Sequence, residues 1–94
     1  MKIYELLDTP NKWTQGAYQR DSQGRICNAQ AGGRGKPVAW CLVGAFQECY
    51  KEPSTQLDFF TQLNSACGGC VTVWNDAQGR TYQEVIDLCR QLDI

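Results

Sequence analysis

Two of the six cysteines have a spacing that suggests chemistry. Cys67 and Cys70 enclose two glycines in the sequence CGGC, and such a pair can bind zinc or act as a redox dithiol. Zinc needs two more ligands, but the chain has no histidine and its other cysteines include no second close pair. A redox pair usually precedes a helix, whereas here a helix is predicted to end at Cys67. Zinc or redox chemistry is therefore an alternative, and we expect a protein without a metal or other cofactor.

Other catalytic groups find little support in the sequence. The absence of histidine removes the usual general base and the residue that most often activates a serine or cysteine nucleophile. Cys41 is expected in the first turn of an apolar helix, where burial raises the pKa of a thiol, so we interpret Cys41, Cys49 and Cys89 as core residues. No two carboxylates stand in an apolar setting that suits acid and base roles. The sequence favours a protein that is not an enzyme.

Charge is distributed unevenly along the chain. The whole chain has a net charge of −1, but in residues 12–36 five basic residues stand against Asp21 alone. These basic residues are Lys12, Arg20, Arg25, Arg34 and Lys36. Together with Trp13 and Tyr18 they could contact the phosphates and bases of a nucleic acid. A pI near 5.2 is unlike that of most nucleic-acid-binding domains, so binding through segment 12–36 is a second alternative.

The spacing of apolar residues predicts mostly helices. Residues 2–8 carry apolar side chains at helical spacing, and Pro10 ends this short helix. Residues 38–50 are apolar on nearly every face, which is typical of a central buried helix. Gly44 and Ala45 in this helix are small enough to let another element approach its backbone.

A third helix is expected to begin at Pro53 and to end at the two glycines of CGGC. Its apolar stripe consists of Leu57, Phe60, Leu63 and Cys67. Residues 71–74, VTVW, are short and β-branched, which predicts an extended segment. Thr81 and Glu84 then match a capping box, so a last helix is expected to start there.

Two turns with similar sequences complete the predicted fold. Segments 13–20 and 25–29 flank Asp21-Ser22-Gln23-Gly24, which favours a type I turn and therefore a β-hairpin. Asp76-Ala77-Gln78-Gly79 repeats this turn chemistry. Residues 30–37 hold three glycines and a proline and are expected to form a loop. The prediction is an α+β fold: one mostly helical domain over residues 1–94, with about four helices around a buried central helix and a small β-hairpin.

Membrane insertion and export are not indicated by the sequence. The first ten residues lack the apolar run of a signal peptide, and no segment approaches the roughly 20 apolar residues that cross a bilayer. We therefore expect a cytoplasmic protein without membrane contact.

Local structure leaves Trp74, Asn75 and Arg80 without an explained role. The wider group of polar residues at the two turns and the tryptophans that border it consists of Trp13, Arg20, Asp21, Trp74, Asn75, Asp76 and Arg80. Because aromatic and arginine residues are enriched at binding hot spots, this group is the candidate site for a protein partner, provided that the two turns meet in space. In the competing structural interpretation, Asp76 accepts the amides of its own turn, Arg20 or Arg80 pairs with an aspartate, and both tryptophans close the core.

Three segments together resemble a family of small uncharacterised bacterial and phage proteins. WTQGAYQRDSQGR carries a W-x-x-G-A pattern, WCLVGAF a C-L-x-G-A pattern and WNDAQGRTYQEV a W-N-D-x-x-G-R-T-x-x-E-V pattern, over about four-fifths of the chain. The family has no assigned reaction, and CGGC is not part of its pattern, so the resemblance implies no shared zinc or redox chemistry. It favours a small cytosolic interaction or regulatory protein, such as a phage or mobile-element accessory factor that modulates a host protein.

Overall fold

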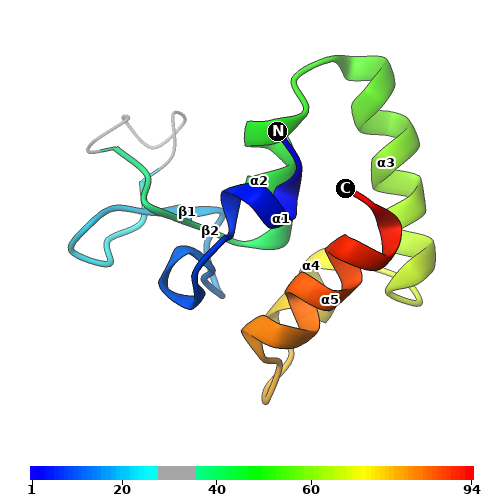
Figure 1. The fold of residues 1–94 in the computed structure, drawn as a ribbon. Helices are drawn as coiled ribbons and strands as arrows, with labels where there is room; N and C mark the ends of the chain where they lie inside the picture. The colour runs from blue at the N-terminus through cyan, green and yellow to red at the C-terminus, as the bar shows by residue number, and fades with distance from the viewer. Residues whose placement is uncertain (28–35) are drawn as a thin grey trace.

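Helices dominate the part of the chain that the structure, a computed structural model, describes: residues 1–27 and 36–94 (Figure 1). The elements are α1 (Ile3–Leu6), a 3-10 helix η1 (Pro10–Lys12), β1 (Gln19–Arg20), β2 (Ala39–Trp40), α2 (Leu42–Cys49), α3 (Pro53–Ala66), α4 (Val71–Asp76) and α5 (Tyr82–Leu92). The small sheet lies on the left of Figure 1 and α3 on the right. The predicted mostly helical α+β class is confirmed. No described helix is both long and apolar enough to cross a membrane.

The core is built around α2, as the apolar run predicted. Its residues from Leu42 to Phe46 are all buried, with α1 and α4 packed against it and α5 packed against α1. The fully buried apolar side chains of the core come from the five α-helices and from the residues just after α1 and α5: Ile3, Leu7, Leu42, Ala45, Leu63, Val71, Val85, Cys89 and Ile94. The backbone amide of Ile3 also donates to the carbonyl of Ile94, which ties the two ends of the chain together.

The start of α2 differs from the prediction. Residues 38–50 were expected to be one helix, but Ala39 and Trp40 form β2, which pairs antiparallel with β1 through Gln19↔Trp40 and Arg20↔Ala39. Cys41 is extended and caps the helix, because its Sγ accepts a hydrogen bond from the Gly44 amide. Pairing with a distant strand therefore overrides the helical pattern of the first residues.

The predicted hairpin is present around its turn but not as the main strand pair. Gly24 donates to the Asp21 carbonyl at 3.0 Å, and Arg20 forms an antiparallel bridge with Ile26. β1 uses its other edge for β2, so the sheet is completed by a segment that the sequence had assigned to a helix. Residues 28 and 29 of the predicted strand, and residues 30–35 of the predicted loop, lie outside the described residues.

Helix α3 begins at Pro53 as predicted, but its buried face is not the predicted stripe. Leu57 is 70% exposed and Phe60 is 38% exposed, whereas Leu63 is fully buried. Phe59 packs against the core in their place, with its ring centroid 4.8 Å from that of Tyr50. The helix therefore turns part of its apolar surface outward.

Residues 71–74 are helical rather than extended, which corrects the prediction for this segment. Gly68 and Gly69 adopt φ values of +75° and +153° and end α3. Asn64 Oδ1 then accepts the amide of Val71 at 3.0 Å, and the buried Val71 side chain fixes α4 in place. The predicted capping box and last helix are confirmed, since Thr81 and Glu84 exchange hydrogen bonds at the start of α5.

Candidate functional site

The segment before the first turn meets the end of α4 at Asn75. Its Oδ1 accepts hydrogen bonds from Trp13 Nε1 at 2.8 Å and from the Leu42 amide at 3.0 Å. Its Nδ2 donates to the Thr14 carbonyl at 3.2 Å and to Asp76 Oδ1 at 2.9 Å. The side chain is 0% exposed, and both of its acceptor positions and both of its donor hydrogens are used. Asn75 therefore joins the segment after Trp13 to α2 and α4.

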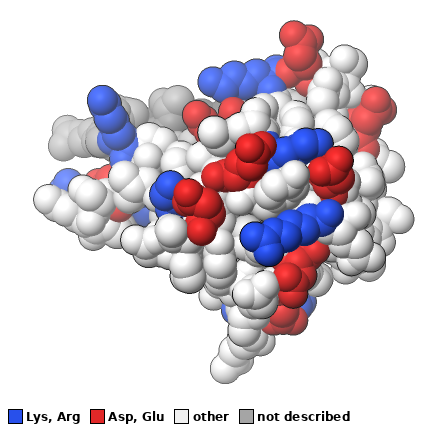
Figure 2. All heavy atoms as spheres, in the orientation of Figure 1, with Lys and Arg blue, Asp and Glu red and all other residues white. Residues whose placement is uncertain are grey.

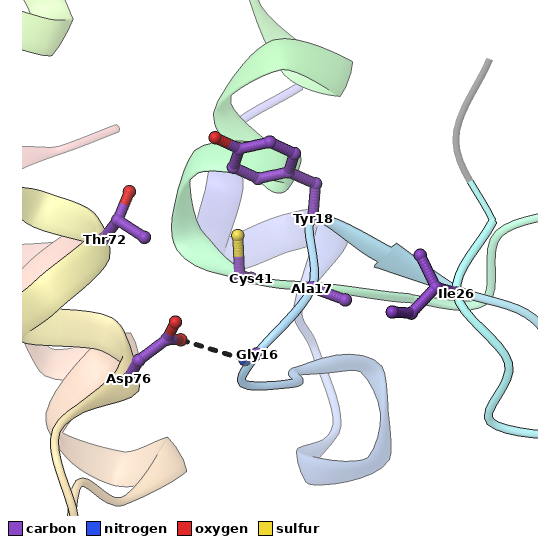
Figure 3. Close-up of a pocket in the computed structure, with 7 residues that line it drawn as sticks. All are labelled: Gly16, Ala17, Tyr18, Ile26, Cys41, Thr72 and Asp76. Atoms are coloured by element: carbon purple, nitrogen blue, oxygen red, sulfur yellow. Dashed lines mark hydrogen bonds between the residues drawn. The ribbon is translucent and has the colours of Figure 1, made fainter. Parts of the chain in front are cut away.

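Gln15 and Gly16 hold the end of α4 from the same segment. Gln15 Nε2 donates to the carbonyls of Asn75 at 2.9 Å and Ala77 at 3.1 Å, which a helix end would otherwise leave without partners. Gly16 has a φ of +80°, and its amide donates to Asp76 Oδ1 at 3.1 Å. Figure 3 shows this bond as a dashed line. The Asp76 carboxylate therefore joins the end of α4 to a segment far away in the sequence.

The second turn consequently begins one residue later than predicted. Asp76 is the last residue of α4, and the turn hydrogen bond runs from the Arg80 amide to the Ala77 carbonyl at 3.0 Å. The predicted role of Asp76 as acceptor of its own turn amides is wrong, because its Oδ1 is held by Gly16 and Asn75. The long-range bonds decide the position of this carboxylate.

Arg80 and Trp74 form a pair of their own beside the second turn. The Arg80 guanidinium carbon lies 4.0 Å from the centroid of the Trp74 ring, a cation–π contact. Arg80 also donates to the Trp74 carbonyl and to Glu84 Oε2, each at 2.9 Å. Its carboxylate partner is thus a glutamate instead of the predicted aspartate. Trp13 and Trp74 both pack partly buried against the core, as the structural interpretation expected.

The aspartate of the first turn, Asp21, forms hydrogen bonds within its own turn. Asp21 Oδ1 accepts the amides of Gln23 and Arg25 at 2.9 Å, and its Oδ2 pairs with Arg25 Nε at 3.2 Å. These amides, that of Arg25 first, lower the pKa of Asp21 below its ordinary value. Asp21 is therefore a local turn residue and makes no contact with the Asn75 group.

Arg20 binds oxygen atoms of neighbouring residues instead of an aspartate, which corrects the second part of the structural interpretation. Its guanidinium donates to Thr14 Oγ1 at 2.9 Å and to the carbonyls of Gln15 and Gly24, each at 3.0 Å. Arg20 therefore braces the segment that contacts Asn75.

Gly44 permits the close packing that the sequence predicted. A Cβ atom at this position would lie 2.0 Å from the carbonyl oxygen of Tyr18, so only glycine fits. The same carbonyl accepts the amide of Cys41 at 3.2 Å. The chain around β1 therefore lies directly on the first turn of α2.

These contacts leave a pocket of about 300 Å³ between the segment around Ala17, the start of α2 and the helix α4. It is lined by Gly16, Ala17, Tyr18, Ile26, Cys41, Thr72 and Asp76. In Figure 3, Thr72 and Asp76 project from α4 on one side, and Tyr18 and Ile26 stand on the other with Cys41 between them. Tyr18 is 48% exposed and Ile26 is 57% exposed, although both are large apolar residues. The arrangement is an open pocket with apolar walls and one carboxylate.

Of the predicted site residues, only Asp76 lines this pocket. Trp13 and Asn75 lie behind it as its support, while Trp74 and Arg80 pack on each other. The sequence patterns did not indicate Ile26 and Thr72 as site residues, and they indicated Tyr18 only for the nucleic-acid alternative. Thr72 and Asp76 are four residues apart and share one helix face, a signal that was lost when residues 71–74 were read as extended.

Three of the six cysteines, Cys41, Cys49 and Cys89, have thiols that are poorly suited to react. Burial raises the pKa of Cys41, and it raises the pKa of Cys49 to about 11 and that of Cys89 to about 12. Cys41 and Cys89 are buried in the core, as expected, and Cys49 packs against it partly buried. These three cysteines would be protonated at neutral pH, and a protonated thiol is a weak nucleophile.

Cys67 and Cys70 require a correction to the predicted helix pattern. Cys67 ends α3, but Cys70 immediately precedes α4, so a helix does begin at the motif. Burial raises the pKa of Cys67, whereas the amides of Val73 and Thr72 lower the pKa of the exposed Cys70. Among the described residues, no three cysteine, aspartate or glutamate side chains are close enough to share a metal ion.

Fold and site together define a small α+β protein in which three separate segments line a surface pocket. The four hydrogen bonds of the buried Asn75 side chain hold these segments together. The chain belongs to the family of unknown function DUF6197, whose model matches residues 2–92. This membership agrees with the resemblance to an uncharacterised family and assigns no reaction to the protein. No significant match was found among curated proteins or among solved structures.

Proposed function

We propose that the protein is a small cytoplasmic interaction protein that binds and modulates another protein through the pocket beside Asp76. The observation that carries this proposal is the combination of a pocket of about 300 Å³ with exposed apolar residues, Tyr18 and Ile26, in its wall. Pockets of this size with few polar groups are typical binding sites, and exposed apolar residues gathered at one place favour a partner. The proposed role is that of a phage or mobile-element accessory factor.

The chemistry of the pocket lining supports a non-enzymatic role. Among the described residues that line it, the groups that can exchange protons are the Asp76 carboxylate, the Tyr18 phenol and the Cys41 thiol. The thiol has a raised pKa and already accepts the Gly44 amide at 3.4 Å. These groups offer no activated nucleophile with a matched base, so binding is the better supported use of the pocket.

Nucleic-acid binding by segment 12–36 has weaker support. Lys12 pairs with Asp8 at 2.8 Å, Arg25 pairs with Asp21, and Arg20 is engaged with neighbouring oxygen atoms. On the face shown in Figure 2, basic and acidic side chains alternate and form no continuous basic surface. Arg34 lies outside the described residues. Phosphate binding would have to compete with these internal contacts.

A thiol-based role rests on one favourable observation, the exposed Cys70 with its lowered pKa. Its test is timed alkylation of the native protein with iodoacetamide, followed by mass spectrometry of each cysteine. A Cys70 that reacts no faster than a free cysteine at the same pH would remove this alternative. A rate well above that of free cysteine would favour it over the interaction role.

The interaction role is tested by capture of partners from an extract of the natural host cell, with nuclease present. The wild-type protein is compared with Ile26→Ser, which removes an exposed apolar side chain from the pocket wall and leaves the core intact. The matched control is Leu57→Ser, which changes an exposed apolar residue of α3 outside this pocket. Circular dichroism confirms that both variants are folded.

A stoichiometric protein that is retained by wild type and by Leu57→Ser, but is lost with Ile26→Ser, supports the proposal. Leu57 lines a second pocket together with Val43 and Phe46 of α2. A partner lost with Leu57→Ser and kept by Ile26→Ser would move the interaction to that second pocket and overturn the proposed site. Capture that disappears with nuclease would favour nucleic-acid binding instead.

A further inference from the structure

We propose that the pocket receives a cationic side chain, lysine or arginine, of the protein partner and that the Asp76 carboxylate is its counter-ion. This inference rests on the proposed function and gives the chemistry of the group that is recognised. It is drawn from the charge of the pocket, from the shape of its walls and from the way Asp76 is held.

Asp76 is the charged group that the pocket offers. Its Oδ1 accepts hydrogen bonds from the Gly16 amide and from Asn75 Nδ2, which fix the carboxylate in one orientation. Its Oδ2 makes no hydrogen bond or ion pair with any described residue. By contrast, the described chain pairs Asp8, Asp21 and Glu84 with a basic residue nearby. A carboxylate that is preorganised and still has a free oxygen is suited to a charge-assisted hydrogen bond.

The walls of the pocket suit the rest of a basic side chain. Lysine and arginine carry an apolar stem that packs on hydrophobic surface while the charged end reaches a polar group. Ala17, Tyr18 and Ile26 line the pocket together with Asp76 and supply such apolar surface. Thr72, one helical turn before Asp76 on the same face of α4, also lines the pocket.

The charges around the pocket favour a cation over an anion. Asp76 is the charged residue among the described lining residues, and the Cys41 thiol is kept protonated by its burial. Arg20 lies beyond Gly16, where its NH2 atom would be 3.5 Å from a Cβ atom added to the glycine. This guanidinium opposes a bound cation, although three oxygen atoms already accept its hydrogens. The resulting interaction is selective, weak for an isolated side chain and sensitive to salt.

The test is titration of the ¹⁵N-labelled protein with single blocked amino acids, followed by NMR. The probes are Nα-acetyl-arginine amide and Nα-acetyl-lysine amide, and the neutral control is Nα-acetyl-citrulline amide, which has nearly the shape of arginine. We expect a cationic probe to shift the amide signals of Gly16, Ala17 and Thr72. Binding should weaken about three- to tenfold when salt rises from about 50 mM to about 500 mM or when citrulline replaces arginine.

Two variants separate charge from structure. Asp76→Asn keeps an oxygen that can accept the Gly16 and Asn75 hydrogens but removes the charge, and it should weaken the cationic probes about three- to tenfold. Asp58→Asn, an exposed change on α3, should leave binding unchanged. Preserved amide signals far from the pocket show that each variant is folded.

Equal shifts with citrulline and arginine, or unchanged binding by Asp76→Asn, would overturn the inference. The same holds if no cationic probe shifts the pocket signals. Host-cell capture with Asp76→Asn distinguishes this failure from failure of the proposed function. A partner that depends on Ile26 but not on the Asp76 charge leaves the interaction role in place and removes only the cation.

Discussion

The two turns of this protein have nearly the same sequence and use their aspartates in opposite ways. In Asp21-Ser22-Gln23-Gly24 the carboxylate accepts two amides of its own turn and pairs with the arginine that follows. In Asp76-Ala77-Gln78-Gly79 the aspartate closes α4, and its carboxylate is held by a glycine amide from a segment about 60 residues away. The turn itself is made without it.

The cause of the difference is the residue before each aspartate. Asn75 is buried and draws the end of α4 toward Trp13 and Thr14, which carries Asp76 out of its own turn. Arg20 before the first aspartate is part of β1 and bonds within its own neighbourhood. Similar turn sequences therefore give an aspartate that stabilises its own turn in one region and an aspartate whose carboxylate lines the pocket in the other.

Replacing Asn75 with alanine should abolish this difference with the largest effect. The Trp13 Nε1 and the Leu42 amide would lose their acceptor. Because each buried donor without a partner costs about 1–3 kcal/mol, we expect a loss of unfolding free energy of about 3 kcal/mol or more. Urea denaturation monitored by circular dichroism measures the change.

The matched control is Asn11→Ala at an exposed position, which should alter the unfolding free energy by no more than about 0.5 kcal/mol. Asn75→Ala with the stability of wild type would show that the second turn is not held by these bonds.

The segment before the first turn packs directly on α2 at Gly44, and Gly44→Ala tests that contact. Alanine normally stabilises a helix relative to glycine by about 1 kcal/mol. Here its Cβ would lie 2.0 Å from the Tyr18 carbonyl, so we expect a destabilisation of about 1–3 kcal/mol instead. The sign of the change in urea midpoint decides, and an increased midpoint would contradict the close packing.

The glycines of the two turns should behave alike, because they are the part that the turns share. Gly24 and Gly79 have φ values of +78° and +83°, with open space where a side chain would be added. Each substitution by alanine should therefore cost about 1 kcal/mol, from the left-handed backbone alone. Thermal unfolding of both variants measures this, and losses that differ by more than about 1 kcal/mol would show that one turn is strained by its surroundings.

Acid sensitivity should be common to the two regions and should give the smallest effect. The pKa of Asp21 is lowered by its turn amides, and that of Glu84 is lowered by the Thr81 amide after the second turn. A lowered pKa gives stability that is present above the ordinary value and is lost as pH falls through the folded one. Between about pH 5 and about pH 2, Asp21→Asn and Glu84→Gln should each lose less stability than wild type does. Melting curves across this range test it, and slopes equal to that of wild type would contradict it.

Features set by neighbouring residues could be predicted from the sequence, and features set by distant ones could not. The capping box of Thr81 and Glu84 and the turn at Asp21 form within a few residues, so their sequence patterns sufficed. The strand at Ala39 needs a partner about 20 residues earlier, and residues 38–40 were therefore assigned to a helix.

The same limit explains what was learned of the site. Of the aromatic and polar group, Trp13, Asn75 and Asp76 do come together. Asp21 and the pair of Trp74 and Arg80 instead make local contacts at their own turns. Which of these residues faces outward depends on the four hydrogen bonds of the Asn75 side chain to three segments of the chain. The spacing of residues in the sequence does not predict these bonds. Tyr18 and Ile26 became visible as a binding surface only through their exposure beside the pocket.

The use of both Asn75 Nδ2 hydrogens in hydrogen bonds also has a consequence for the chemical stability of the protein over time. Asparagine amides are among the chemically labile groups of proteins and hydrolyse slowly to carboxylic acids. At this position the reaction would replace Nδ2, which donates to the Thr14 carbonyl and to Asp76 Oδ1, with an oxygen that repels both. While the fold is closed, the amide is buried and held in place. A molecule that opens long enough for Asn75 to deamidate could not form these two hydrogen bonds again. A single irreversible reaction would therefore destabilise that molecule permanently.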